Sequence, residues 1–219
     1  MKNNVIFFDC DGTILDTFLL IEKVTLQVFK EVLPNVNVTM DEIHAFFGPL
    51  LDESFKKYAK DDQQLNECIE RYRYYNMAWH EQYVKSYPGI KELLMALQKL
   101  DFDLVIVSNK ITEAINHGLA INGINRLFTE IIGAEKLQAP KPDPTGINEY
   151  IKEHHYHNIY FVGDSKYDMM CADNIKKTYP NLKSVGVTWC QTTRAEFEQL
   201  GADYIIDQPM ALLEVIQNG

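Results

Sequence analysis

The chain has 219 residues and carries 21 basic against 31 acidic side chains, which gives a formal net charge of −10. Its hydrophobic content of 46% supports a packed core and excludes a disordered chain. The acidic balance argues against nucleic acids and anionic membranes as partners, and it favours a protein that attracts a cation.

Three features predict a cytoplasmic protein. No apolar run approaches the roughly 20 residues that a membrane span requires, and the N-terminus reaches Asp9 too early for a signal peptide. The cysteines lie far apart in the sequence, without the spacing of a zinc site, so we expect reduced, buried thiols. They are Cys10, Cys68, Cys171 and Cys190.

The first predicted strand, residues 5–8, is a short apolar run that stops at Asp9. A long stretch without strand patterns follows, and much of it has the apolar spacing of helices. The predicted helices lie at residues 18–33, 40–46, 50–60 and 63–82, with breaks at Pro34 and at Gly48-Pro49. We therefore expect an α-helical insert over residues 16–82.

Strand and helix patterns alternate from residue 83 onward. The predicted strands lie at residues 104–107, 130–132, 159–162, 184–187 and 204–206. The predicted helices lie between most of these strands, at residues 90–100, 111–119, 145–154 and 193–200. This alternation predicts an α/β fold, a Rossmann-like parallel sheet with helices on both faces, formed by residues 1–15 and 83–219.

Two carboxylates follow the first predicted strand, at the end where parallel sheets place their ligands. Asp9 and Asp11 lie two residues apart, which costs free energy unless a cation is close or one carboxyl group is protonated. Gly12 allows a sharp turn that brings its N–H toward a ligand.

Polar residues also follow later strands. Ser108 and the N–H of Asn109 come just before a predicted helix, a position that suits a phosphate oxygen. Lys141 stands between two prolines, which stiffen the backbone around a positive charge. Asp164 and Asp168 add oxygen ligands of the kind that favour Mg²⁺ over zinc.

Together these residues resemble the four motifs of the haloacid dehalogenase-like superfamily of phosphohydrolases. The segment FFDCDGTILDT resembles the first motif, VIVSNK the second, the lysine of APKPDP the third and FVGDSKYDMMCAD the fourth. The helical insert falls where one subgroup carries an α-helical cap. Within that subgroup, Phe47-Gly48-Pro49-Leu50 and Ser108-Asn109-Lys110 look most like phosphoglycolate phosphatases and the similar pyrophosphatases.

This resemblance implies a Mg²⁺-dependent phosphatase that hydrolyses a small, phosphoglycolate-like metabolite through an aspartyl-phosphate intermediate. Asp9 would be the nucleophile, Asp11 the general acid and base, and Lys141 the group that neutralises negative charge. The implied substrate-binding residues are Gly12, Ser108, Asn109 and, in the cap, Gly48. The implied metal ligands are Asp9, Asp11 through its backbone carbonyl, Asp164, and Asp168, which could instead orient Lys141.

Asp11 favours hydrolysis or phosphoryl transfer, because dehalogenating relatives lack an acid at that position. An inorganic pyrophosphatase, a phosphosugar mutase with the same core motifs, and an inactive binding protein remain as alternatives. The natural substrate and the oligomeric state leave no signature in the sequence.

Two further features have simpler explanations than a functional site, and a third concerns the length of a loop. We interpret the aromatic and basic segment 71–79 as a helix face packed on its neighbours rather than as a surface that stacks nucleotides. We interpret His154, His155 and His157 as the exposed end of a helix rather than as a metal site. Residues 172–181 predict a longer connection after the fourth motif than the family usually has.

Overall fold

A computed structural model of the protein describes residues 3–218. The chain forms two compact units, of which the first combines Met1–Asp16 with Ser86–Gly219 and the second is the continuous stretch Thr17–Lys85. The second unit begins one residue after the helical insert expected at residues 16–82 and ends three residues after it. Among the residues that the structure describes, no helix combines the length and the apolar character that crossing a membrane requires.

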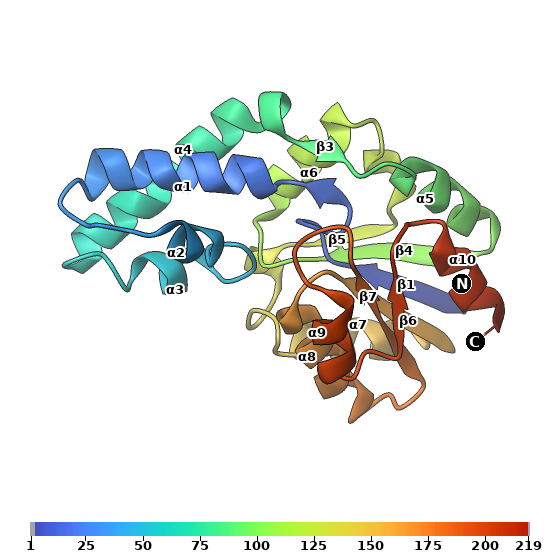
Figure 1. The fold of residues 1–219 in the computed structure, drawn as a ribbon. Coiled ribbons are helices and arrows are strands. Elements are labelled where there is room, and N and C mark those ends of the chain that lie inside the picture. Colours follow the sequence, from blue (N-terminus) through green and yellow to red (C-terminus); the bar gives the residue numbers. More distant parts are fainter. Residues whose placement is uncertain (1–2, 219) are drawn as a thin grey trace. The chain divides into compact units, whose positions relative to one another are not determined.

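Within residues 3–218, six parallel strands form the sheet of the first unit (Figure 1). They are β1 (Asn4–Phe8), β4 (Phe102–Val107), β5 (Glu130–Ile132), β6 (Asn158–Gly163), β7 (Leu182–Val187) and β8 (Tyr204–Ile206). Their order across the sheet is β5-β4-β1-β6-β7-β8, with parallel pairing throughout. Numbered along the chain, this is the 3-2-1-4-5-6 order of Rossmann folds, so the predicted α/β fold is confirmed.

Helices cover both faces of this sheet (Figure 1). They are α5 (Ile90–Lys99), α6 (Thr112–Ile121), α7 (Thr145–His154), α8 (Lys166–Lys176), α9 (Arg194–Gln199) and α10 (Ala211–Asn218), with 3₁₀ turns at Asn125–Leu127 and Ala134–Lys136. Right-handed crossovers explain the division. The chain moves one way across the sheet from β1 to β5 and the other way from β5 to β8, so α7 and α8 cover the face opposite to α5 and α6.

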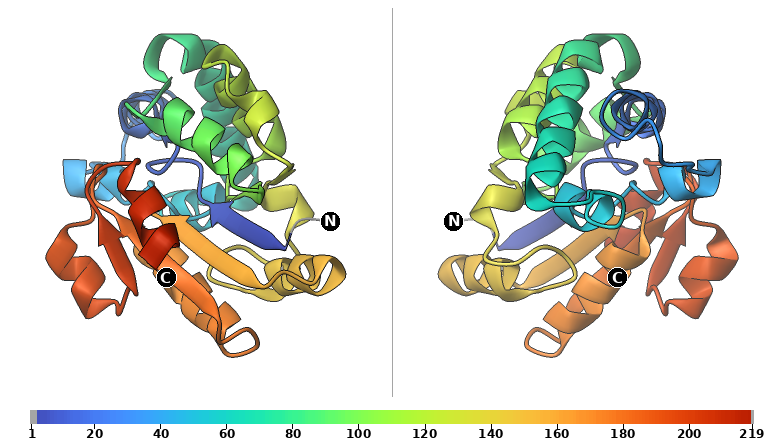
Figure 2. Two further views of the ribbon diagram at one scale, coloured as in Figure 1. Left: turned by 90° about the vertical axis from the view of Figure 1, so that its right-hand side faces the viewer. Right: turned by 90° about the vertical axis from the view of Figure 1, so that its left-hand side faces the viewer.

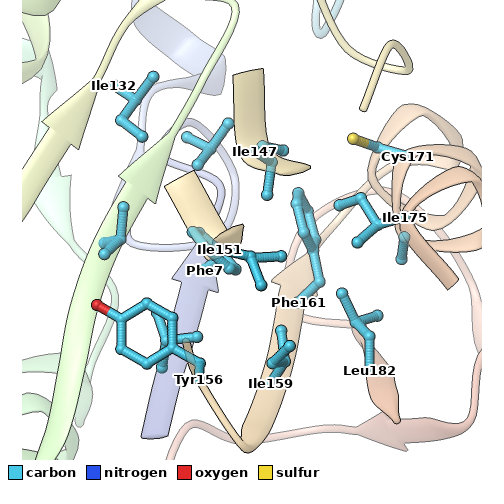
Figure 3. Close-up of a cluster of buried hydrophobic side chains, with 14 residues drawn as sticks. Phe7, Ile132, Ile147, Ile151, Tyr156, Ile159, Phe161, Cys171, Ile175 and Leu182 are labelled. Atoms are coloured by element: carbon cyan, nitrogen blue, oxygen red, sulfur yellow. The ribbon is translucent and has the colours of Figure 1, made fainter. Parts of the chain in front are cut away.

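The hydrophobic core follows from the alternation of side chains along the strands. Phe7 of β1 and Phe161 of β6 pack with Ile151 of α7 in a buried cluster on one face (Figure 3). Ile6 and Phe8, which point to the other face, are buried as well. Burial on both faces is typical of parallel strands and explains why the strands read as continuous apolar runs.

The unit Thr17–Lys85 consists of helices around an aromatic interior. The helices are α1 (Phe18–Val32), α2 (Met40–His44), α3 (Leu51–Phe55) and α4 (Asp62–Tyr83), and α1 and α4 lie side by side (Figure 1 and Figure 2). The rings of Phe29, Phe46, Phe55, Tyr58 and Tyr72 contact one another. Segment 71–79 lies on α4 with Tyr72 buried, which supports its interpretation as a packed helix face.

The prediction of a helix over residues 50–60 is wrong in its second half, because α3 ends at Phe55. Two contacts turn the chain before α4. Asp61 caps α4 by accepting a hydrogen bond from the N–H of Gln64, and the Gln64 side chain accepts one from the N–H of Lys60. These groups define the start of α4. The chain leaves α3 earlier, in a turn where the N–H groups of Tyr58 and Ala59 both donate to the carbonyl of Phe55.

Two other details differ from the expectations. The connection after the fourth motif is short: α8 continues to Lys176, and a turn at residues 177–181 leads directly into β7. Helices α8 and α10 were not among the predicted elements. Finally, β2 (Leu15–Asp16) and β3 (Lys85–Ser86) pair as a small second sheet, at the two points where the chain passes between the units.

Candidate active site

The sheet brings the predicted site residues of the first unit to one edge. Its switch point lies between β1 and β6, which are neighbours although the chain runs from β1 to β4 on the other side. Asp9 follows β1 and Asp164 follows β6, and Ser108 follows the adjacent β4. Their carboxyl-end positions therefore place these side chains around a common point.

Lys141 joins this edge from the loop between β5 and α7. Its Nζ donates hydrogen bonds to Asp9 Oδ1 at 2.5 Å and to Asp168 Oδ1 at 2.6 Å. Asp9, Lys141 and Asp168 are all buried. Burial opposes the charge of the ammonium, but Asp168 and Asp9 outweigh it and raise the pKa of Lys141 above its usual value. Lys141 is therefore a permanently charged bridge between two carboxylates.

The carboxyl groups outnumber this cation. Burial raises the pKa of Asp9 to about 7, although Lys141 lowers it. Burial, together with Asp9 and Asp168, raises the pKa of Asp164 as well. Buried carboxyl groups hold their protons in this way when too little positive charge is near. The negative charge of the cluster therefore exceeds what Lys141 neutralises, and a further cation would stabilise it.

A hard divalent cation fits this donor set. Asp9, Asp164 and Asp168 each offer a carboxylate oxygen, and these oxygens lie within 4.8 Å of one another. All three are buried, and oxygen-only ligands of this kind suit Mg²⁺ rather than zinc. Thr13 Oγ1 donates to Asp164 Oδ1 at 3.1 Å and so fixes the orientation of that carboxylate.

Asp168 differs from the other two carboxylates because hydrogen bonds already use both of its oxygens. Oδ1 accepts from Lys141, and Oδ2 accepts from the N–H of Ser165 at 3.0 Å and from its hydroxyl at 2.6 Å. The Ser165 contacts form a capping box at the start of α8. This arrangement favours the alternative role for Asp168, that of orienting Lys141.

Asp11 belongs to a second ion pair of the site. Lys110 Nζ donates to Asp11 Oδ1 at 2.9 Å, and the two side chains are 10% and 18% exposed, respectively. The Asp11 side chain is thus more accessible than that of Asp9, which is 10% exposed. Sequence reasoning did not assign Lys110 a function, although the residue lies in the second motif.

Ser108 and Asn109 connect the second motif to the loop of Lys141. Ser108 is buried, and its Oγ accepts a hydrogen bond from the N–H of Lys110 at 3.3 Å. The side chain of Asn109 accepts from the N–H of Lys141 at 2.9 Å and donates to its carbonyl at 3.4 Å. The sequence predicted only a backbone role for Asn109, so these two side-chain hydrogen bonds to the Lys141 backbone are contacts of the candidate site that were not predicted.

Two glycines make the close packing of these carboxylates possible. Gly12 has a φ of 88°, and a Cβ there would lie 2.3 Å from Asp164 Oδ2. A Cβ at Gly163 would lie 2.3 Å from Asp168 Cβ. Any side chain at either position would displace a carboxylate. The Gly12 N–H is not directed at a ligand, as the sequence suggested, because it donates to the carbonyl of Leu15 at 2.8 Å. Gly12 instead contributes through its backbone freedom and its lack of a side chain.

The other predicted residues lie elsewhere. Gly48 belongs to the unit Thr17–Lys85, between α2 and α3, with a φ of 109°. His155 and His157 are exposed, as expected, whereas His154 at the end of α7 is half-buried and stacks on Tyr150 at 4.2 Å between ring centroids. The cysteines are free thiols; three are buried, whereas Cys190 is partly exposed. Burial and the nearby Asp164 raise the pKa of the Cys190 thiol.

Comparison with known families and proteins gives a consistent result. Residues 6–179 match the family model for haloacid dehalogenase-like hydrolases. The chain is 29% identical over 223 residues to the pyrophosphatase PpaX of Listeria monocytogenes serotype 4b, an alignment that covers 99% of this chain and 98% of the relative.

Solved structures show the same fold. A haloacid dehalogenase-like hydrolase from Streptococcus pneumoniae superimposes with a TM-score of 0.81 at 26% identity, over 97% of this chain and 98% of that one. A structure named as a "predicted phosphoglycolate phosphatase" from Haemophilus somnus gives a TM-score of 0.82 at 22% identity and covers 99% of each chain. The resemblance found in the four motifs is therefore confirmed.

Proposed function

Because the chain belongs to the haloacid dehalogenase-like hydrolases and matches phosphatases along its length, we propose that it is a Mg²⁺-dependent phosphatase that acts on a small, phosphoglycolate-like metabolite. The main support is the buried Lys141 ammonium, which contacts both Asp9 and Asp168 beside Asp164. This arrangement offers a nucleophile and a fixed positive charge for an incoming phosphate at one point.

Asp9 acts as the nucleophile in this proposal. Its carboxylate attacks phosphorus, the bond to the leaving oxygen breaks, and an aspartyl phosphate forms. A carboxylate and a phosphate repel each other, so the attack requires positive charge between them. Lys141, at 2.5 Å from Asp9, supplies it in a site where little water screens the interaction. Ser108 and the N–H of Asn109 hold the oxygens of the transferred group.

Asp11 handles the protons. It donates a proton to the leaving oxygen in the first step and takes one from the attacking water in the second. Its greater exposure gives water access for that second step. Asp9 cannot take this role, because its carboxylate is covalently occupied during the second step.

Asp9, Asp164 and the backbone carbonyl of Asp11 would hold Mg²⁺, with Asp168 as a more distant ligand or as the residue that orients Lys141. The bound ion would supply Lewis-acid polarisation of a phosphate oxygen. Within the same proposal, the helical unit Thr17–Lys85 serves as the cap, and Gly48 is the residue of the cap that binds the substrate. The protein acts in the cytoplasm.

Inorganic pyrophosphate is the second candidate substrate. The observation that favours it is the full-length similarity to a relative named as a pyrophosphatase. The core residues would act on either compound, because both present a phosphoryl group and differ only in the leaving group. A direct assay must therefore separate the two.

We expect phosphate release from phosphoglycolate that requires Mg²⁺ and stops when EDTA removes the ion. The assay measures free phosphate from phosphoglycolate, pyrophosphate, hexose phosphates and an aryl phosphate, with and without Mg²⁺. Phosphate release mainly from pyrophosphate would identify pyrophosphate, the second candidate, as the substrate. No release from any compound would contradict the proposed function, and isomerisation of a hexose phosphate without free phosphate would replace it by a mutase.

Substitution Gly12→Ala is expected to weaken Mg²⁺ binding and to lower phosphate release by about 100-fold or more, because the new Cβ would collide with Asp164. The left-handed backbone adds a cost of about 1–2 kcal/mol in stability. Gly201→Ala is the matched control, since Gly201 also has a positive φ of 72° but nothing lies within 4 Å of its Cβ. Mg²⁺ titrations and thermal denaturation measure both effects, and equal Mg²⁺ affinities in the two variants would contradict the close contact.

We expect Mg²⁺ to raise the melting temperature more at pH 8 than at pH 6. The pKa of Asp9 is raised to about 7 in the metal-free protein, so at pH 6 most molecules carry a proton there that the ion must displace. The same shift means that metal-free stability decreases as pH rises from about 4 to about 7, because only the folded state retains the proton. Thermal denaturation with Mg²⁺ or EDTA at both pH values tests this, and a smaller Mg²⁺ effect at pH 8 would contradict it.

A further inference from the structure

Lys110 is a partly buried cation without a role in the reaction proposed above. Its side chain is only 10% exposed, and its Nζ lies 2.9 Å from Asp11 Oδ1. Its position in the chain is next to the phosphate-binding pair Ser108 and Asn109, and its N–H donates to Ser108 Oγ. Lys110 is therefore fixed at the site by both its backbone and its ammonium group.

The two lysines of the site contact different carboxylates. Lys141 contacts Asp9, which attacks phosphorus, so Lys141 lies beside the transferred phosphoryl group. Lys110 contacts Asp11, which protonates the leaving oxygen, so Lys110 lies beside the leaving group. The attacking and leaving oxygens lie on opposite sides of phosphorus in phosphoryl transfer. The two positive charges therefore serve opposite ends of the substrate.

We propose that Lys110 binds a second anionic group on the leaving group, so that the enzyme selects small phosphates whose leaving group is itself an anion. This inference rests on the proposed function and narrows its substrate class. The second anion can be a carboxylate, as in phosphoglycolate, or a phosphate, as in pyrophosphate. A charged hydrogen bond from a largely buried ammonium is strong enough to discriminate such compounds from neutral ones.

A pair of substrates with the same two-carbon skeleton in the leaving group tests the proposal. Phosphoglycolate and ethyl phosphate share this skeleton, but only phosphoglycolate carries a carboxylate on it. We expect Lys110→Met to lower kcat/KM for phosphoglycolate by about 100-fold, the loss typical of a charged hydrogen bond, and for ethyl phosphate by less than about fivefold. Each loss compares the variant with the unmodified protein on the same substrate. The different reactivities of the two leaving groups therefore do not affect the comparison of the losses. Pyrophosphate, measured in parallel, shows whether the second anion is a carboxylate or a phosphate.

Two further variants serve as controls. Lys176→Met removes a comparable ion pair of the same unit, in which Nζ lies 2.8 Å from Asp203, and should leave both kcat/KM values unchanged. Lys110→Arg keeps the charge and should restore part of the preference for the anionic leaving group. Thermal denaturation shows that each variant is folded, and Lys110→Gln replaces Lys110→Met should that protein not fold.

The outcomes are distinguishable. An equal loss on phosphoglycolate and ethyl phosphate would mean that Lys110 only positions Asp11, and it would overturn the inference. A selective loss on either phosphoglycolate or pyrophosphate supports it and identifies the second anion. If the unmodified protein released phosphate from none of these compounds, the proposed function itself would fail, independently of Lys110.

Discussion

Asp9→Asn protein is expected to fold normally and to lose phosphate release by about 10⁴-fold or more, because an amide cannot form the aspartyl phosphate. The substitution keeps the size of the side chain and an oxygen that can accept from Lys141. It also removes a buried carboxyl group whose pKa is raised to about 7 by burial, so stability at pH 8 should not decrease. Phosphate release and thermal denaturation are the two measurements.

The control for this variant is Asp173→Asn. Asp173 lies on α8 with a side chain that is 53% exposed, and its weak contact with Lys176 lies outside the candidate site. This variant should retain full activity. Substantial turnover by pure Asp9→Asn protein would disprove the nucleophilic mechanism, whatever the control does.

Lys141→Met should lose both activity and stability. It leaves Asp9, Asp164 and Asp168 buried together without their ammonium partner, and breaking a buried pair in this way costs about 3–5 kcal/mol. The loss should be largest at pH 8 in EDTA, because protons at lower pH and Mg²⁺ each compensate part of the negative charge. Urea denaturation at pH 6 and pH 8, with and without Mg²⁺, gives the free energy of unfolding.

Lys176→Met provides the comparison for stability. Lys176 bonds to Asp203 and Ser184 with a side chain that is 22% exposed, and loss of such a pair costs about 1 kcal/mol or less. A Lys141→Met protein as stable as this control in EDTA at pH 8 would show that the buried carboxyl groups do not depend on Lys141.

Much of the fold could be predicted because its strands are buried on both faces. Such strands appear as short apolar runs, and each predicted run overlaps an observed strand of the sheet. The ends of the helices were harder to predict from the sequence. After α3 the chain turns, with the N–H groups of Tyr58 and Ala59 donating to the carbonyl of Phe55, and the Asp61 cap then starts α4. The apolar period does not encode these local hydrogen bonds. Helix α10 was missed because it follows the last predicted strand, where no further alternation was expected.

The site could be predicted from the residue types at the strand ends. The contacts between these residues could not be predicted from the sequence. Lys110 meets Asp11 from 99 positions away, and Thr13 meets Asp164 from 151. Only the strand order brings such pairs together, and no local pattern encodes it. One contact had a local signal: the spacing of Ser165 and Asp168 is that of a capping box, which explains how the Asp168 carboxylate is held.

The central position of β1 also has a consequence for assembly of the chain. β1 ends just before Asp9, but its neighbours β4 and β6 begin only at Phe102 and Asn158. Pairing them closes loops of about 100 and about 150 residues, at an entropic cost that grows only slowly with length. The continuous unit Thr17–Lys85 can form from local contacts while it shortens the first of these loops. The candidate nucleophile Asp9 thus precedes Lys141 by 132 positions, and it meets this partner only after the intervening chain has been made.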